Sequence, residues 1–86
     1  MTQEIKDKLD YLIKLDKAYT ECHWDYQRAF EYRNINGGKR YSQILRAIEQ
    51  KDSEVWETIA KEYNVKGRWN LPREIIEYYE NGRNKN

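Results

Sequence analysis

The chain has little of what small proteins use to cross-link themselves or to bind metals. Its 86 residues include one cysteine and one histidine, the neighbours Cys22 and His23. A single cysteine cannot form an internal disulfide, and a metal site needs three or four ligands. The sequence therefore predicts no disulfide, no metal and no cofactor.

An excess of charge and long apolar runs are also missing. Sixteen basic and 15 acidic side chains give a net charge of +1. This balance excludes a DNA mimic and argues against nucleic-acid binding without sequence preference. No apolar run approaches the roughly 18–20 residues that cross a bilayer, and nothing resembles a secretion signal. We therefore expect a cytoplasmic protein that does not bind membranes.

Aliphatic side chains are scarce, and aromatic side chains take their place. Ile, Leu, Val and Phe together number 16, whereas the chain has three Trp and eight Tyr. Each large ring buries about 150–250 Å² but keeps a polar tip. A core of such rings reaches the surface, where a partner could dock. We expect one small domain over residues 1–86.

Glycine and proline are absent from residues 1–36, where the apolar side chains form one helical stripe. The spacing predicts an amphipathic helix from about Gln3 to about Arg33. Asn34 to Gly38 then predicts its end, because Asn and Gly tolerate left-handed conformations, with an irregular connection over 34–40. The stripe consists of Ile5, Leu9, Leu12, Tyr19, Cys22, Tyr26, Ala29 and Phe30.

The rest of the chain predicts shorter helices. A second stripe pauses at 50–53, where Asp52 or Ser53 could cap a new helix, so we expect helices over 41–50 and 53–64. The phase of the stripe also permits one continuous helix. Residues 64–70 are typical of a loop, and Pro72 suits the first turn of a last helix that ends at 81–82. The predicted fold is all-α, with a long N-terminal helix packed on a cluster of three shorter helices and a frayed tail over 82–86.

The sequence offers no catalytic set. Adjacent residues on a helix point about 100° apart, so Cys22 and His23 cannot face each other as a nucleophile and its base must. Carboxylate pairs such as Asp7 and Asp10 lie on polar helix faces beside lysines. We therefore expect a protein that is not an enzyme.

One face of the first helix could mediate self-association. Two polar groups interrupt its apolar pattern seven positions apart, and buried polar residues can fix the register of paired helices. The residues that would form a homodimer interface are Asp16, Tyr19, His23, Tyr26 and Phe30.

Residues 55–65 resemble the first helix and turn of helix-turn-helix proteins, in their apolar residue, Ala, two polar residues and a turn that ends in Val65. The resemblance implies a DNA-binding unit over 53–80 with a recognition helix after the turn. Gly67, Asn70 and Pro72 would delay that helix to about Leu71. The DNA contacts in this alternative are Lys39, Arg40, Lys66, Arg68 and Arg73.

Two tryptophans are candidates for contacts with a protein partner. Trp69 lies in the predicted loop, either as a contact with a partner or as a plug that closes the helix cluster, and Trp and Arg dominate binding hot spots. Trp24 lies opposite the main stripe. The predicted partner-binding residues are Trp69, Arg68, Trp24, Arg28 and Lys66.

These features together predict a non-enzymatic binding module that occupies the surface of a protein partner, as small regulatory or inhibitory proteins do. The size and the Asn-, Lys- and Tyr-rich composition suit a phage or mobile-element accessory protein that blocks a host defence system. Two alternatives stay open: a DNA-binding regulator, and a protein that sequesters a small molecule or nucleotide between aromatic walls.

Overall fold

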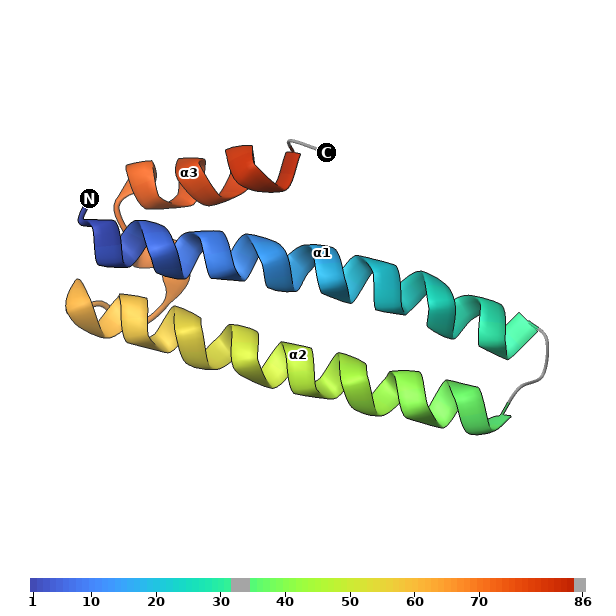
Figure 1. Ribbon diagram of the computed structural model, residues 1–86. Coiled ribbons are helices and arrows are strands. Elements are labelled where there is room, and N and C mark those ends of the chain that lie inside the picture. The colour runs from blue at the N-terminus through green and yellow to red at the C-terminus, as the bar shows by residue number, and fades with distance from the viewer. Residues whose placement is uncertain (32–34, 85–86) are drawn as a thin grey trace.

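Two long antiparallel helices form the frame of the protein. The computed structural model describes residues 1–31 and 35–84, except for the side chains of 29, 30 and 35–37. Helix α1 spans Gln3–Glu31 and α2 spans Ile35–Glu62. The short 3-10 helix η1, Arg68–Asn70, leads to α3, Arg73–Asn84, which runs along α1 and stops about halfway (Figure 1). Every described element is helical, so the all-α prediction is confirmed.

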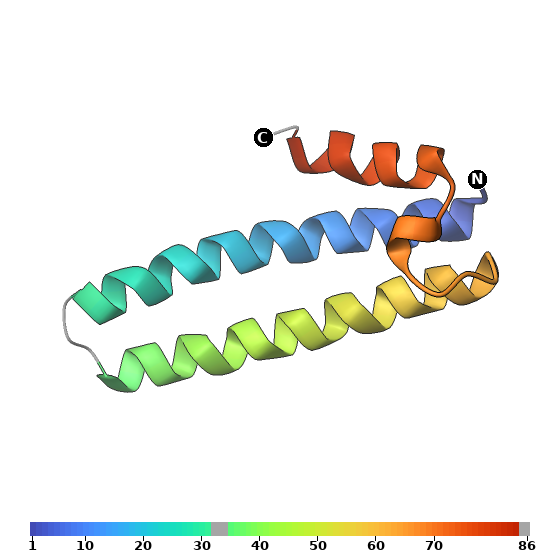
Figure 2. The same cartoon turned by 180° about the vertical axis from the view of Figure 1, so that it is seen from behind.

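The core lies at the end of the hairpin that α3 covers. The connection between α2 and α3 crosses one face of the hairpin there (Figure 2). Complete burial of an aliphatic side chain stabilises the fold by roughly 1.5–3 kcal/mol. The fully buried side chains are Ile5, Leu9, Leu12, Ile59 and Ile75, and around them pack Ile13, Trp56, Leu71 and Tyr79.

Helix α2 is continuous, so the predicted division into helices over 41–50 and 53–64 is wrong. The apolar stripe keeps its phase through residues 50–53, and an unbroken helix buries both halves of it against α1. Asp52 caps no helix. Its half-buried carboxylate lies near Arg68 and Asp16 instead.

The prediction of an irregular connection over 34–40 is also wrong for residues 35–40. These residues belong to α2. Each glycine in a helix interior costs about 1 kcal/mol relative to alanine. Packing of this end of α2 on α1 offsets that cost: the Cys22 Sγ donates to the Tyr41 carbonyl oxygen at 3.7 Å. The predicted end of the first helix near Arg33 lies outside the described residues.

Residues 82–84 continue α3 and are not a frayed tail. Gly82 packs against Ile13, and the Arg83 Nε donates to the Asp16 Oδ2 at 3.2 Å. These contacts hold the last turn on α1. The structure thus has two long helices, α1 with 29 residues and α2 with 28, and the two short helices η1 and α3. The predicted arrangement had one long helix on three shorter ones.

Candidate partner-binding site

The site begins with a tight turn at the end of α2. Asn64 has a left-handed φ of 55°. Its N–H donates to the Lys61 carbonyl at 3.1 Å, and the Val65 N–H donates to the Ala60 carbonyl at 3.0 Å. These two bonds form a Schellman motif, which ends a helix and reverses the chain. The loop predicted over 64–70 therefore begins one residue earlier, at Tyr63, because α2 ends at Glu62.

The 3-10 helix η1 then presents Trp69 to solvent. The Leu71 N–H donates to the Arg68 carbonyl at 3.2 Å, which closes the turn. Leu71 is 6% exposed and reaches the core, whereas Trp69 is 79% exposed. Trp69 is therefore not the plug that closes the helix cluster, because Leu71 fills the core position, and its contact with a partner stays a prediction.

Arg68 lies between two indole rings. Its Cζ is 5.2 Å from the ring centroid of Trp56 and 4.9 Å from that of Trp69. Trp56 is buried and packs edge-on against Tyr79, with ring centroids 5.1 Å apart. A guanidinium over an indole gains about 0.5–2 kcal/mol. The exposed Trp69 therefore lies next to the Arg68 guanidinium, which also packs on the buried Trp56 ring.

Trp56 is the residue of this site that the sequence did not single out, since it is one apolar residue among several of the second stripe. Its indole N–H is buried and has no hydrogen-bond acceptor in the described part of the chain. A buried donor without an acceptor costs about 1–3 kcal/mol. Contacts of the ring with Tyr79 and Arg68, rather than a hydrogen bond, therefore hold Trp56.

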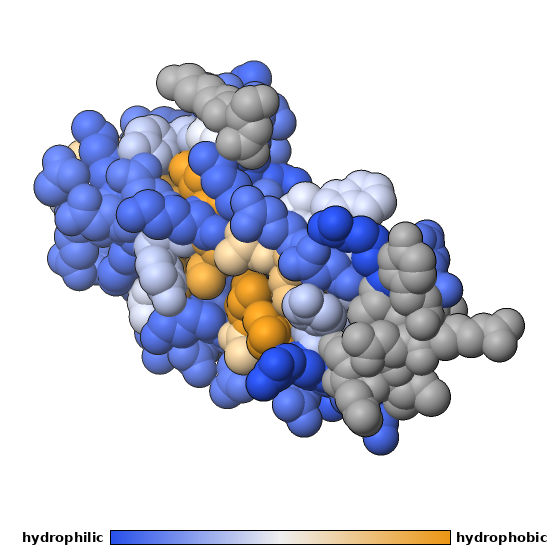
Figure 3. All heavy atoms as spheres, turned by 45° about the vertical axis from the view of Figure 1, so that its right-hand side comes forward, coloured by the Kyte–Doolittle hydropathy of each residue, from blue (hydrophilic) through white to orange (hydrophobic). Residues whose placement is uncertain are grey.

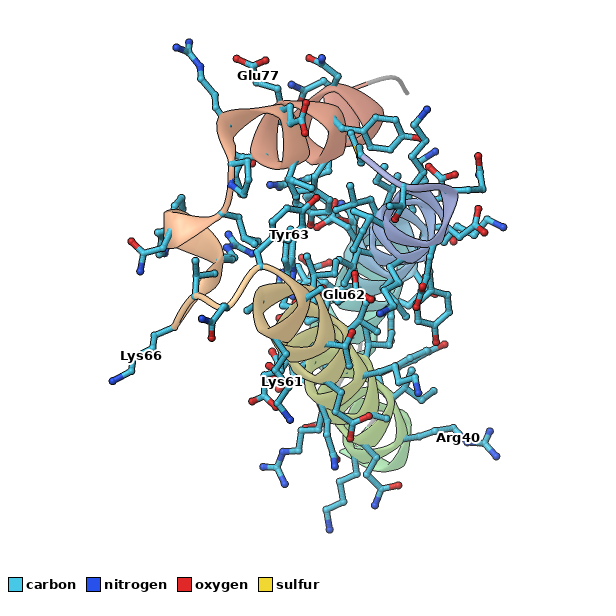
Figure 4. The ribbon with its side chains drawn as sticks, turned by 90° about the vertical axis from the view of Figure 1, so that its left-hand side faces the viewer. Arg40, Lys61, Glu62, Tyr63, Lys66 and Glu77 are labelled. Atoms are coloured by element: carbon cyan, nitrogen blue, oxygen red, sulfur yellow. The ribbon has the colours of Figure 1, made fainter. Side chains whose placement is uncertain are left out.

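A groove of about 490 Å³ lies between the last turns of α2 and the connection that follows them. Its apolar lining consists of Trp56, Ala60 and Val65. Lys66 extends from the connection away from the helices (Figure 4). The charged side chains that line the groove are the cations Lys61, Lys66 and Arg68 and the acids Asp52 and Glu57.

Positive charge is in slight excess in the groove, with three cations against two acids. Within residues 1–31 and 35–84, no ion pair joins Lys61, Lys66 or Arg68 to a carboxylate. The pKa of Asp52 is raised, chiefly by burial, while Arg68 lowers it and Asp16 raises it. Arg68 thus acts on Asp52, and Glu57 is the other carboxylate of the lining, against the two lysines Lys61 and Lys66.

Trp24 and Arg28 lie elsewhere, with His23, Gln27 and Glu31 around a second hollow. Trp24 is 62% exposed, and the Arg28 Nη2 forms an ion pair with the Asp25 Oδ1 at 2.6 Å. This hollow lies close to the contact of Cys22 with Tyr41, and Tyr41 is about 22 Å along α2 from Trp56. The structure therefore brings Trp69, Arg68 and Lys66 together but not Trp24 and Arg28.

The face predicted for self-association is partly engaged inside the chain. Asp16 pairs with Arg83, and the Tyr19 hydroxyl donates to the Glu49 Oε1 at 3.1 Å, which raises the pKa of Tyr19. His23 is exposed and stacks on Tyr19 with centroids 6.3 Å apart. Tyr26 is half-buried, and the side chain of Phe30 lies outside the described residues.

Cys22 and His23 diverge as their adjacent positions on the helix predict. Cys22 is 9% exposed, whereas His23 faces solvent. Burial is the main cause that raises the pKa of the Cys22 thiol, with a smaller contribution from the charge of Asp25. Both effects disfavour the thiolate, the reactive form of cysteine.

The helix pair that the helix-turn-helix resemblance implies is not formed. Ten residues, 63–72, separate α2 from α3, and α3 packs mainly on α1. In that family a short turn joins two helices that pack on each other. Lys39 and Arg40 lie at the opposite end of α2 from Lys66, and Arg73 pairs with Glu77 at 2.8 Å.

Exposed apolar surface elsewhere is limited. Figure 3 shows one face on which a narrow apolar area lies among hydrophilic side chains. Isolated exposed apolar side chains are common on soluble proteins. Besides Trp69 and Trp24, the large apolar side chains exposed in the described part of the chain are Met1, Tyr11 and Ile44.

Comparison with other proteins does not identify a function. No protein family, curated protein or solved structure matches this chain. Across residues 1–31 and 35–84, no helix is both long enough and apolar enough to span a membrane. No group of three His, Cys, Asp or Glu side chains in the same residues could hold a metal ion.

Proposed function

We propose that this protein is a small non-enzymatic binding module, and that it occupies the surface of a protein partner through Trp69, Arg68 and the adjoining groove. The observation that carries the proposal is the exposure of Trp69, at 79%, beside a guanidinium held on buried Trp56. A rigid ring with an ordered cationic neighbour loses little conformational entropy when it binds.

The magnitude of this contact suits a binding hot spot. Covering the exposed part of an indole that offers 150–250 Å² contributes roughly 4 kcal/mol before the costs of association are subtracted. Hydrogen bonds from Arg68 would add orientation, because a guanidinium recognises carboxylates in a fixed geometry. Trp69 and Arg68 therefore combine the two residue types that dominate hot spots.

A module of this kind regulates or inhibits its partner by covering a surface that the partner needs for another contact. We extend the proposal to an accessory protein of a phage or mobile element that blocks a host defence system. This extension is supported only by the small size and the Asn-, Lys- and Tyr-rich composition.

Affinity capture tests the proposal with two tryptophan variants. The wild-type chain, Trp69→Ala and Trp24→Ala are each immobilised and exposed to lysate of the source cell, and mass spectrometry quantifies the retained proteins. Trp24→Ala is the matched control, because Trp24 is also exposed but lies in the other hollow. Thermal melting confirms that all three chains are folded.

We expect the wild-type chain and Trp24→Ala to retain the same partner, and Trp69→Ala to lose it. Binding of the purified partner should weaken by about 2 kcal/mol or more, close to 30-fold in Kd. Equal retention by all three chains would remove Trp69 from the interface. An empty capture by the wild-type chain would count against a protein partner.

A further inference from the structure

We infer that the groove beside Trp69 receives an acidic segment of the partner, with an apolar side chain against the lining formed by Trp56, Ala60 and Val65 and carboxylates at Lys61 and Lys66. This inference rests on the proposed protein-binding function and adds the chemistry of the partner. The occupant is a peptide segment in which acidic residues flank an apolar residue.

Local charge is the first argument. The chain as a whole has a net charge of only +1, but residues 61–73 contain four basic side chains and one acidic side chain, Glu62. Lys8 of α1 already pairs with Glu62 at 3.4 Å. Arg73 pairs with Glu77, so the three cations that line the groove face two acids, Asp52 and Glu57, and leave a local charge of +1 that is complementary to an acidic segment.

The order of side chains along the groove gives the second argument. Asp52 lies at one end and Lys61 at the other, and between them on α2 lie the buried Trp56 and Ala60 and the acidic Glu57. Asp52 and Glu57 would both repel a carboxylate, so an acidic group is expected beyond them, at Lys61 and Lys66. The apolar lining between the ends suits an aliphatic or aromatic side chain of the same segment.

The size of the groove is the third argument. A volume of about 490 Å³ falls within the range of roughly 300–1,000 Å³ typical of ligand pockets, and is too small for a globular surface to enter. A short extended segment can place one side chain in it while the neighbouring residues reach Lys66 and Trp69. Trp69 would then cover the segment from the side.

Selection from a random peptide display library on the immobilised full chain tests the inference. The selected peptides are synthesised with a fluorescent label, and anisotropy measures their affinity for four chains. These are the wild type, Lys61→Gln with Lys66→Gln, Trp69→Ala, and Lys14→Gln with Lys17→Gln. The last chain is the matched control, because it removes the same charge from exposed positions of α1 outside the groove.

We expect selected peptides to be enriched in Asp and Glu next to an apolar residue. Their affinity should fall about tenfold or more in the Lys61 and Lys66 variant, and should fall with rising salt. The control should stay within about twofold of the wild type, because distant exposed charges are screened. Replacing Asp and Glu of a selected peptide by Asn and Gln should lower its affinity for the wild-type chain by a similar factor.

Two other outcomes would overturn the inference and are distinguishable. Peptides without acidic enrichment that still depend on Trp69 would refute the acidic segment but leave the proposed function standing. A single-stranded oligonucleotide that displaces the peptides at lower concentration than free acidic peptide does would make the groove a nucleic-acid site. That outcome would overturn the proposed function as well.

Discussion

Gly82 of α3 lies directly against Ile13 of α1. A Cβ atom added at Gly82 would overlap the Cδ1 of Ile13 and lie 3.1 Å from its Cγ1. Ile13 is itself 9% exposed, so its side chain has little free space into which to move. Gly82 is therefore a packing residue: the missing side chain lets the last turn of α3 approach α1.

We expect Gly82→Ala to destabilise the fold by about 1–3 kcal/mol, the usual effect of overpacking, although alanine favours helix. Gly38→Ala is the matched control, because an added Cβ there would lie 4.0 Å from the Tyr26 ring. That change should raise the free energy of unfolding by about 0.5–1 kcal/mol. Urea denaturation measures both, and stabilisation by Gly82→Ala would contradict the close approach.

Asn64 should tolerate glycine better than alanine. Its φ of 55° costs an ordinary side chain about 1–2 kcal/mol, whereas glycine adopts it freely. We expect Asn64→Ala to lower the free energy of unfolding by about 1 kcal/mol, and Asn64→Gly to match or exceed the wild type. Asn81→Ala, at an exposed position inside α3, should not destabilise. Equal stability of the two Asn64 variants would show that no left-handed cap forms.

Asp52 should reduce stability at neutral pH. Burial raises its pKa in the folded chain above the ordinary value of 3.8. The folded chain then keeps the proton to higher pH than the unfolded chain does, so stability is lost as pH rises from 3.8 through the raised pKa. We expect Asp52→Asn to raise the melting temperature at pH 7, and the gain to vanish below pH 3.8. If Asp52→Asn still had the higher melting temperature below pH 3.8, the raised pKa of Asp52 would not be the cause of the difference.

The Cys22 thiol should react slowly while the chain is folded. Burial and the charge of Asp25 raise its pKa above the ordinary value of 9.0, and the reagent cannot reach a side chain that is 9% exposed. We expect labelling by an aromatic disulfide reagent to be limited by opening of the structure. The rate should therefore rise steeply with urea. Fast labelling without urea would place Cys22 at the surface.

The candidate site was predictable where its residues are neighbours in the sequence. Trp69, Arg68 and Lys66 share one loop, and the loop follows from Asn64 and Gly67, so local composition sufficed. Trp56 was not predictable as their partner. It belongs to an apolar stripe twelve residues before Arg68, and only the turn at the end of α2 brings the guanidinium back onto its ring.

Sequence periodicity by itself determined that the chain is helical and that Ile5, Leu9, Leu12 and Cys22 of α1 are buried, and local composition placed the end of α2 within two residues of Glu62. These properties depend on side-chain spacing and on the left-handed preference of Asn64, which act within a few residues. Tertiary structure alone decided that α2 runs through Gly37, Gly38 and Asp52, and that α3 includes Gly82. At those positions the local preference against a helix costs only about 1 kcal/mol per residue, and packing of the helix on α1 outweighs this cost.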